Sequence, residues 1–191
     1  MAKEFLNLHF DFTGLYKAVD KLENAVLEAV QPAAQAGAQV LYDQARQNVP
    51  VGTEDHVFYG TSYKGKRKKN GQRSEGKGTT YNFPAGTLRD SIYQVLSKDY
   101  DKNTAVKKTY HVAWNHKKAP YGFMVEYGTI RTYAVVKGKD GKFYTTSNKR
   151  KDGPKVVPGK AFLRRTWDSH NGIALEAMRA EMKFQLKDYA S

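Results

Sequence analysis

The chain has 191 residues, of which 40% are hydrophobic, and a formal net charge of +13. This length fits one domain, or one domain with long loops, and we expect a single domain over residues 1–191. The sequence contains no cysteine, which excludes disulfides, thiolate catalysis and cysteine-based zinc sites. The positive charge indicates an acidic partner such as duplex DNA, a phosphate-rich surface or an acidic protein face, and is also compatible with plain solubility.

The sequence gives no sign of a membrane or export segment. Residues 1–12 contain no apolar run long enough for the core of a signal peptide, and no stretch approaches the length of a membrane span. We therefore expect a soluble protein that is made in a cytoplasm and has no membrane partner.

The first fifty residues change from a strand pattern to a helix pattern. Alternation over residues 6–12 predicts a half-buried strand, and helical spacing follows with Thr13 as the N-cap. Pro32 interrupts this spacing, which predicts one kinked helix or two short helices ending before Pro50. The second half is rich in Ala and Gly, so we expect it to pack tightly against a sheet or a neighbouring subunit. The helical series consists of Leu15, Val19, Leu22, Val26, Val30, Ala34, Ala38, Leu41 and Ala45.

Residues 54–83 are expected to form a long basic loop insertion, because glycines and basic residues dominate them and little apolar area is available to bury. Three interpretations of this loop remain open: contact with nucleic-acid phosphates, a solvated loop, or an arm that orders against an acidic neighbouring subunit. The candidate contact residues are Lys64, Lys66, Arg67, Lys68, Lys69 and Arg73, with the interleaved aromatics Tyr59, Tyr63 and Tyr81.

The middle of the chain predicts short elements. Residues 88–96 form a strand, or a helical turn leading into a strand, and clean alternation over 104–114 predicts a further strand. Residues 120–127 fit a short helix closed by Gly128. Two β-prone runs, 132–136 and 143–146, flank an Asp-Gly turn, which predicts a hairpin.

The last part of the chain predicts a loop and a helix. Residues 137–160 hold the hairpin and then a basic loop from Lys149 to Lys160. An amphipathic stripe runs from Leu163 to Tyr189, with Gly172 as a point where it can bend, and Trp167 is expected in the core. The fold class is therefore α+β: a small, mainly antiparallel sheet packed by a long kinked N-terminal helix and a C-terminal helix, with long basic loops.

Residues with the chemistry of an active site are scattered. None of the five histidines forms the i, i+4 pair of a zinc hydrolase, and His111 and His116 would face opposite sides of one strand. Ser91 stands in Arg-Asp-Ser-Ile, which is not a nucleophile elbow. We therefore predict no catalytic residue, no metal site, no cofactor and no enzymatic activity.

Two carboxylates lie in motif-like segments, Asp90 and Glu126. General acid–base catalysis would need two carboxylates brought together with shifted pKa values, which the sequence does not indicate. We expect Glu126 to form a salt bridge or to cap a turn, and a partly buried ion pair with Arg89 is one hypothesis.

Four motif-like segments follow one another along the chain: Pro50-Val51, Thr87-Leu88-Arg89-Asp90-Ser91-Ile92, Tyr121 with Val125-Glu126-Tyr127-Gly128-Thr129, and Pro158 with Phe162-Leu163-Arg164. Taken in this order, they resemble the HK97 gp10-like family of tailed-phage head–tail connector (neck) and tail-completion proteins. The resemblance covers about residues 33–189. The basic segment separates the first two pieces, which lie close together in the family, and Gly122, Ala161 and Arg165 also depart from the family pattern.

The resemblance implies that the motif residues determine fold and interfaces, since the family has no catalytic residues. The positions that it marks are Leu88, Arg89, Ser91, Ile92, Tyr121, Glu126, Gly128, Pro158, Phe162 and Leu163.

The resemblance also implies a function: a structural virion protein of a siphovirus-like phage, joining the capsid portal complex to the tail. The expected partners are copies of the chain in a hexameric ring, and neighbouring neck proteins such as a head-completion or adaptor protein, a tail terminator or a tail tube. Contact with genomic DNA would be non-specific. The expected location is the virion neck, after synthesis in the host cytoplasm. The alternative is a non-specific nucleic-acid-binding protein that uses the same basic loops, with tyrosines as stacking groups.

Overall fold

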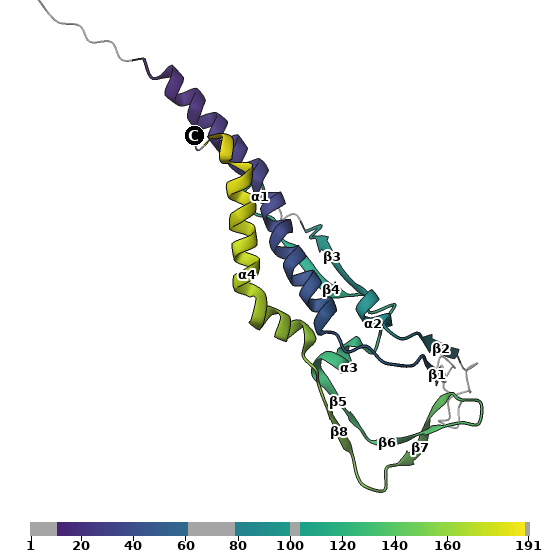
Figure 1. Cartoon of the computed structure of the whole chain (residues 1–191). Helices are drawn as coiled ribbons and strands as arrows, with labels where there is room; N and C mark the ends of the chain where they lie inside the picture. The colour runs from purple at the N-terminus through teal and green to yellow at the C-terminus, as the bar shows by residue number, and fades with distance from the viewer. Residues whose placement is uncertain (1–10, 61–78, 100–103, 190–191) are drawn as a thin grey trace, which may run out of the picture. The chain divides into compact units, whose positions relative to one another are not determined.

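The computed structural model describes residues 11–60, 79–99 and 104–189 (Figure 1). The chain divides into two compact units. The first unit consists of Met1–Val40, Val95–His111 and Gly172–Ser191, and the second of Leu41–Gln94 and Val112–Asn171. The boundaries between the two units therefore fall inside helices and strands that are themselves unbroken along the chain.

Helices are separated by groups of two to four short strands along the described residues. The helices are α1 (Thr13–Asn48), α2 (Thr87–Asp90), α3 (Gly122–Tyr127), α4 (Phe162–Gln185) and the 3₁₀ turn η2 (Lys187–Tyr189). The strands are β1 (His56–Gly60), β2 (Thr79–Phe83), β3 (Ile92–Leu96), β4 (Tyr110–Trp114), β5 (Gly128–Arg131), β6 (Tyr133–Lys137), β7 (Phe143–Lys149) and β8 (Lys155–Pro158).

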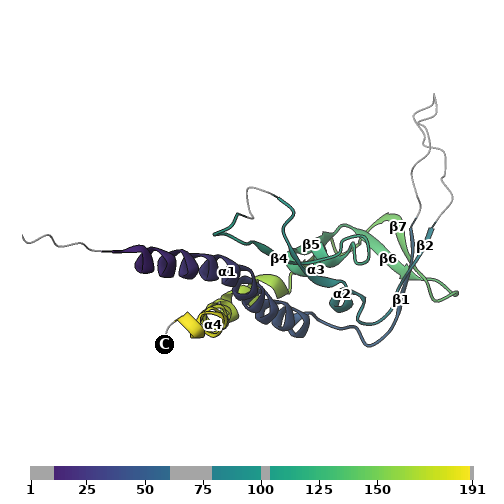
Figure 2. The ribbon, with the colours of Figure 1, turned by 90° about the horizontal axis from the view of Figure 1, so that it is seen from above.

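The strands form small sheets that are mainly antiparallel, which confirms the predicted fold class. The largest has the order β2-β1-β7-β6, with antiparallel pairs at both sides and a parallel contact between β1 and β7 (Figure 2). β3 pairs with β4, and β5 pairs antiparallel with β8. The fold class is right, although the single expected sheet is divided into several.

In the first unit, α1 and α4 pack side by side (Figure 1). Gly37 lies against Met178, where a Cβ atom added to the glycine would stand 2.6 Å from the Met178 Cγ atom. Ala29, Ala33 and Ala38 are buried in the same stretch of α1. The small residues thus allow close approach, as expected, but the element that approaches them at Gly37 is a helix of the same chain.

α1 is one continuous helix with Pro32 inside it, so the two-helix alternative is wrong. Its start also differs from the prediction. Thr13 is the first helical residue, and its N–H donates to the Asp11 carboxylate at 2.8 Å, so Asp11 supplies the cap that we assigned to Thr13. The predicted strand over 6–12 lies almost wholly outside the described residues.

The core of the second unit surrounds the start of α4. Its buried members are Ala45, Val49, Leu88, Ile92, Ala119 and Phe162. Phe162 has no exposed surface, and the Trp114 ring meets it edge-on at 5.8 Å between centroids. Helix ends, turns and strands that are far apart in the sequence therefore meet at one aromatic side chain.

The expected loops contain strands. Residues 54–83 begin with β1 and end with β2, which pair from His56 with Phe83 to Gly60 with Thr79. β7 continues to Lys149, and β8 occupies Lys155–Pro158 of the expected basic loop. We underestimated these strands because pairing satisfies backbone groups even where the composition is polar.

Other local predictions succeeded in part. The Asp-Gly hairpin is confirmed, with β6 and β7 antiparallel and Gly141 at φ 77°. The strand predicted over 104–114 is confirmed only for Tyr110–Trp114, and Val106 is exposed. The core assignment of Trp167 is wrong, because its side chain is 60% exposed while the preceding Thr166 takes the buried face of α4.

Candidate functional site

The motif residues meet at a joint where Glu126 caps α4. Glu126 is 5% exposed, and its two carboxylate oxygens accept the N–H groups of Leu163 at 3.0 Å and Arg164 at 3.2 Å. These N–H groups belong to the first turn of α4, which has no intrahelical acceptors for them. The carboxylate also lies at the positive end of the helix dipole. A buried charge is thereby satisfied without a basic side chain.

Two glycines allow the backbone to close on itself beside this cap. Gly128 has φ 85°, and a Cβ atom there would stand 2.6 Å from the Val157 carbonyl oxygen. A Cβ atom on Gly159 would stand 2.4 Å from the Glu126 carbonyl oxygen. Both contacts are with backbone, so only glycine fits. Gly128 was predicted as the end of α3, whereas the requirement for Gly159 became visible only in the structure.

The Leu-Arg-Asp-Ser-Ile segment inserts its apolar members into the same core. Leu88 and Ile92 are buried, and the buried Ser91 hydroxyl donates to the Leu88 carbonyl oxygen at 2.7 Å. This bond closes the turn from α2 into β3, which is a structural role for the serine. Burial raises the pKa of Tyr121, whose ring packs edge-on against Phe83 at 5.0 Å between centroids.

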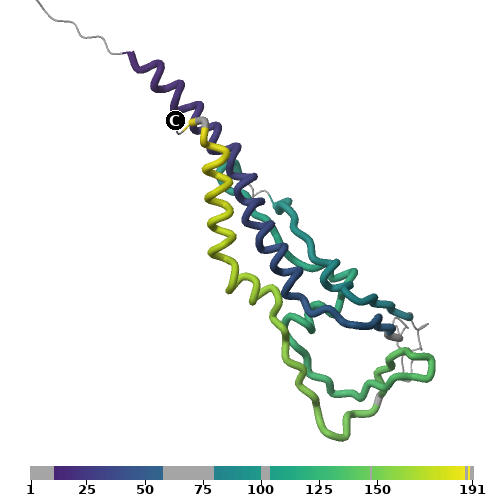
Figure 3. Tube along the Cα trace, in the orientation of Figure 1, coloured from purple at the N-terminus to yellow at the C-terminus, as the bar shows by residue number. Residues whose placement is uncertain are grey.

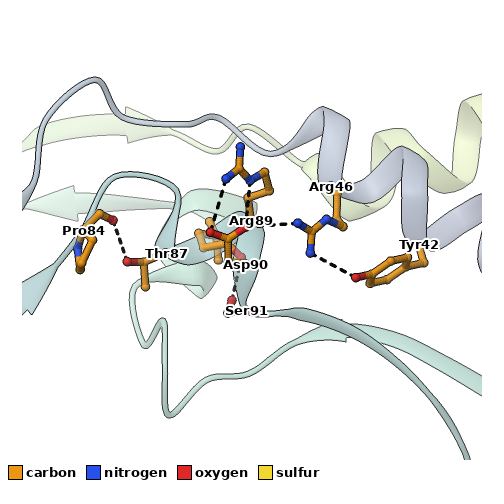
Figure 4. Close-up of polar contacts among 8 residues, drawn as sticks. Tyr42, Arg46, Pro84, Thr87, Arg89, Asp90 and Ser91 are labelled. Carbon is orange, nitrogen blue, oxygen red and sulfur yellow. Dashed lines mark hydrogen bonds and ion pairs between the residues drawn. The ribbon is translucent and has the colours of Figure 1, made fainter.

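Arg46 on the last turn of α1 is joined to this turn through Asp90 (Figure 4). The Asp90 carboxylate accepts from Arg89 Nε at 3.0 Å and from Arg46 Nη2 at 3.2 Å, and Arg46 also donates to the Tyr42 hydroxyl. The hydrogen bond from Arg89, supported by the charge of both arginines, lowers the pKa of Asp90. The cluster is largely exposed, so its contribution to stability is modest.

The predicted ion pair between Arg89 and Glu126 is therefore wrong. Arg89 pairs with its neighbour Asp90, and the Glu126 carboxylate is occupied by the N–H groups of α4. Our other expectation for Glu126, a capping role, is right in kind, although the capped element is a helix that starts 36 residues later.

Most of the basic interface candidates lie outside the described residues. These are Lys64, Lys66, Arg67, Lys68, Lys69 and Arg73, together with Tyr63. Tyr59 belongs to β1, where its backbone pairs with Thr80, and its side chain is outside the described part. Tyr81 is 44% exposed on β2 and stacks with Phe83 at 6.3 Å between centroids.

Among the described residues, no three His, Asp or Glu side chains gather as metal ligands would. A shallow hollow is lined by Asn48, Arg165, Asp168 and Ser169 and is open to solvent. None of the helices in the described ranges is both long and apolar enough to cross a bilayer.

Large apolar side chains on the surface of the first unit are a feature that we did not predict. The residues Phe12, Leu15, Tyr16, Val19, Leu22 and Val26 of α1 and its N-terminal flank are between 37% and 70% exposed. We call them the α1 stripe. Their helical spacing was visible in the sequence, but spacing alone does not reveal whether another element covers it.

Comparisons of this chain with protein-family models, with curated proteins and with solved structures gave no match.

Proposed function

We propose that this chain is a structural subunit of a tailed-phage virion, which assembles into a ring at the neck or at the completed end of the tail. The observation that carries the proposal is the joint around Glu126. The motif residues that produce the resemblance to neck proteins come from separate segments, and they meet in one core as buried side chains, a helix cap and close backbone contacts. Such roles suit a protein whose motifs determine shape.

The exposed apolar surface gives independent support. Monomeric soluble proteins rarely expose contiguous large apolar patches, and such patches often mark interaction sites. The α1 stripe is one such surface, and the exposed Ile130, Val156 and Trp167 of the second unit add others. A subunit that is buried in a larger assembly needs such surfaces.

The proposal is tested in the genome that encodes the chain. Deleting its gene should leave filled heads and tails that do not join, or tails of abnormal length, as seen by electron microscopy of the lysate. Supplying the gene from a plasmid should restore infectious particles, and the protein should then be present in purified virions by mass spectrometry. Normal infectious virions without the protein would refute the proposal.

Duplex-DNA binding by the purified protein separates the proposal from the nucleic-acid alternative. Non-specific binding through phosphates weakens steeply with salt, with a slope of about −0.9 per phosphate neutralised. Tight binding with a steep slope that is lost when Lys66–Lys69 are replaced by glutamine would favour the alternative. Weak binding combined with ring formation supports the neck protein.

A further inference from the structure

The α1 stripe continues a seam that α4 covers farther along the same helix. With about 3.6 residues per turn, Leu15, Val19, Leu22 and Val26 lie in line with the buried Ala29, Ala33 and Gly37. The covered part of the seam has small residues, and Gly37 contacts Met178 of α4. The uncovered part has large ones. Large apolar side chains thus stand where no helix of the described residues packs on them.

α4 ends before it can cover the stripe. The Lys21 amine lies 5.4 Å from the centroid of the Tyr189 ring, at the C-terminal end of η2. The first turns of α1 extend past this end (Figure 3). Leu15 and Val19 are 61% and 52% exposed, whereas Val26, nearer the α4 contact, is 37% exposed.

The stripe lies in the acidic part of a basic chain. Residues 11–30 hold four acidic and two basic side chains, a net charge of −2, while the whole chain carries +13. On the helix, Glu23 lies beside the stripe, and Lys17 and Lys21 lie on the opposite side. A partner for this surface should therefore combine an apolar centre with basic flanks.

The paired strands β5 and β8 offer this combination. Ile130 lies directly opposite Val156, so the two side chains share one face of the ribbon, and they are 65% and 68% exposed. We call this pair the ribbon face. An isolated pair of strands is marginally stable in water unless another element packs on its apolar face. The ribbon face is thus a second apolar surface without a cover in the described chain.

The charge around the ribbon face is positive. Residues 128–158 hold eight basic and two acidic side chains, a net charge of +6. Arg131 lies directly opposite Lys155 on the other face of the ribbon, and like charges in this arrangement destabilise a strand pair unless an anion offsets them. Among the described residues, no ion pair involves either of them. An acidic partner on the ribbon would supply the missing charge.

We propose that the α1 stripe of one copy of this chain packs on the ribbon face of a second copy, which brings the acidic first part of α1 beside the basic segment 128–158. The interface joins different surfaces of the two copies, so it is heterologous and can close into a ring. The inference rests on the proposed ring and specifies which surfaces make it. The opposite charges of the two surfaces would also speed their encounter at low salt.

Two complementary variants test the pairing. Leu15→Arg with Val19→Arg disables the stripe, and Ile130→Glu with Val156→Thr disables the ribbon face; all four positions are more than half exposed, so folding is preserved. Each variant alone should be monomeric, at 21.6 kDa, under conditions in which the parent forms rings. An equimolar mixture should form a dimer and nothing larger, because each variant retains one intact surface. Rings from either variant, or a mixture that stays monomeric, would overturn the inference.

Cross-linking provides a second readout that needs no loss of function. The chain has no cysteine, so Val19→Cys and Val156→Cys introduce single reactive sites. Mixing the two variants with a short bismaleimide should give a cross-linked dimer, and each variant alone should not. Val106→Cys, at an exposed position outside both surfaces, is the control partner for Val156→Cys. If the parent forms rings without the 19–156 cross-link, this interface is wrong while the proposed function stands; a parent absent from virions refutes the function itself.

Discussion

Replacing Glu126 by alanine should destabilise the second unit by about 2–4 kcal/mol. The change removes both acceptors for the N–H groups of Leu163 and Arg164 and leaves them in a site that is 5% exposed. A hydrogen bond to a charged group contributes about 1.5–3 kcal/mol, and a conventional helix N-cap about 0.5–2 kcal/mol. Partial entry of water keeps the total below the sum of two charged bonds.

Glu126→Gln removes the negative charge of the side chain and keeps its size and shape. The amide keeps one acceptor oxygen, but its NH₂ group faces a helix N–H, and the favourable interaction with the helix dipole is lost. We expect a cost of about 1–3 kcal/mol, smaller than that of alanine. Asp152→Ala is the matched control, because Asp152 is an exposed partner of Arg150 in the same unit, and it should cost less than about 0.5 kcal/mol.

Urea unfolding followed by tryptophan fluorescence measures these costs. Both tryptophans of the chain, Trp114 and Trp167, belong to the second unit, so their signal reports the unit that contains Glu126. If Glu126→Ala costs no more than Asp152→Ala, the buried cap contributes nothing, and our explanation of the joint is refuted.

Three further predictions concern titration and packing. The hydrogen bond from Arg89 lowers the pKa of Asp90, so the ionised Asp90 should stabilise the fold fully above its ordinary pKa of 3.8. This stabilisation should be lost as the pH falls through the lower pKa of the folded state. The difference in urea midpoint between the parent and Asp90→Asn should therefore shrink in acid, and a constant difference would contradict this. Burial raises the pKa of Tyr121, so the neutral phenol should contribute to stability fully below its ordinary pKa of 10.0. This contribution should be lost as the pH rises through the higher pKa of the folded state. An ultraviolet titration of Tyr121→Phe should lack one late-ionising phenol of the parent, and loss of an early-ionising one would count against the assignment. Gly159→Ala should lower the free energy of unfolding by about 1–3 kcal/mol or more, because the added Cβ atom clashes with backbone. Gly14→Ala in α1, where the Cβ atom meets open space, should raise it by at most about 1 kcal/mol. Equal thermal midpoints for the two variants would rule out the close approach of Gly159 to the Glu126 backbone.

Local patterns predicted the elements whose cause is local. The Asp-Gly turn defined the hairpin of β6 and β7, and Gly128 ended α3 with the positive φ that a glycine allows. The turn into β3 was one of two alternatives, and the structure has the helical turn α2 followed by the strand. In these cases the residues that determine the conformation lie within a few positions of one another.

Interactions between distant segments could not be predicted in this way. β1 and β2 satisfy one another's backbone groups across a segment whose composition resembles a loop. The partner of Glu126 is a helix terminus, which has no side-chain signature in the sequence. The exposure of Trp167 depends on which face of α4 is covered, and that of the α1 stripe on where α4 ends; an amphipathic pattern does not contain this information.

The capping of α4 by a residue from α3 also has a kinetic consequence. Starting a helix is unfavourable, and here the group that completes the first turn is 37 residues away from Leu163 in the chain. The first turn of α4 should therefore become stable only after the intervening strands have brought α3 into place. Loss of the carboxylate would then accelerate unfolding of the second unit much more than it slows refolding.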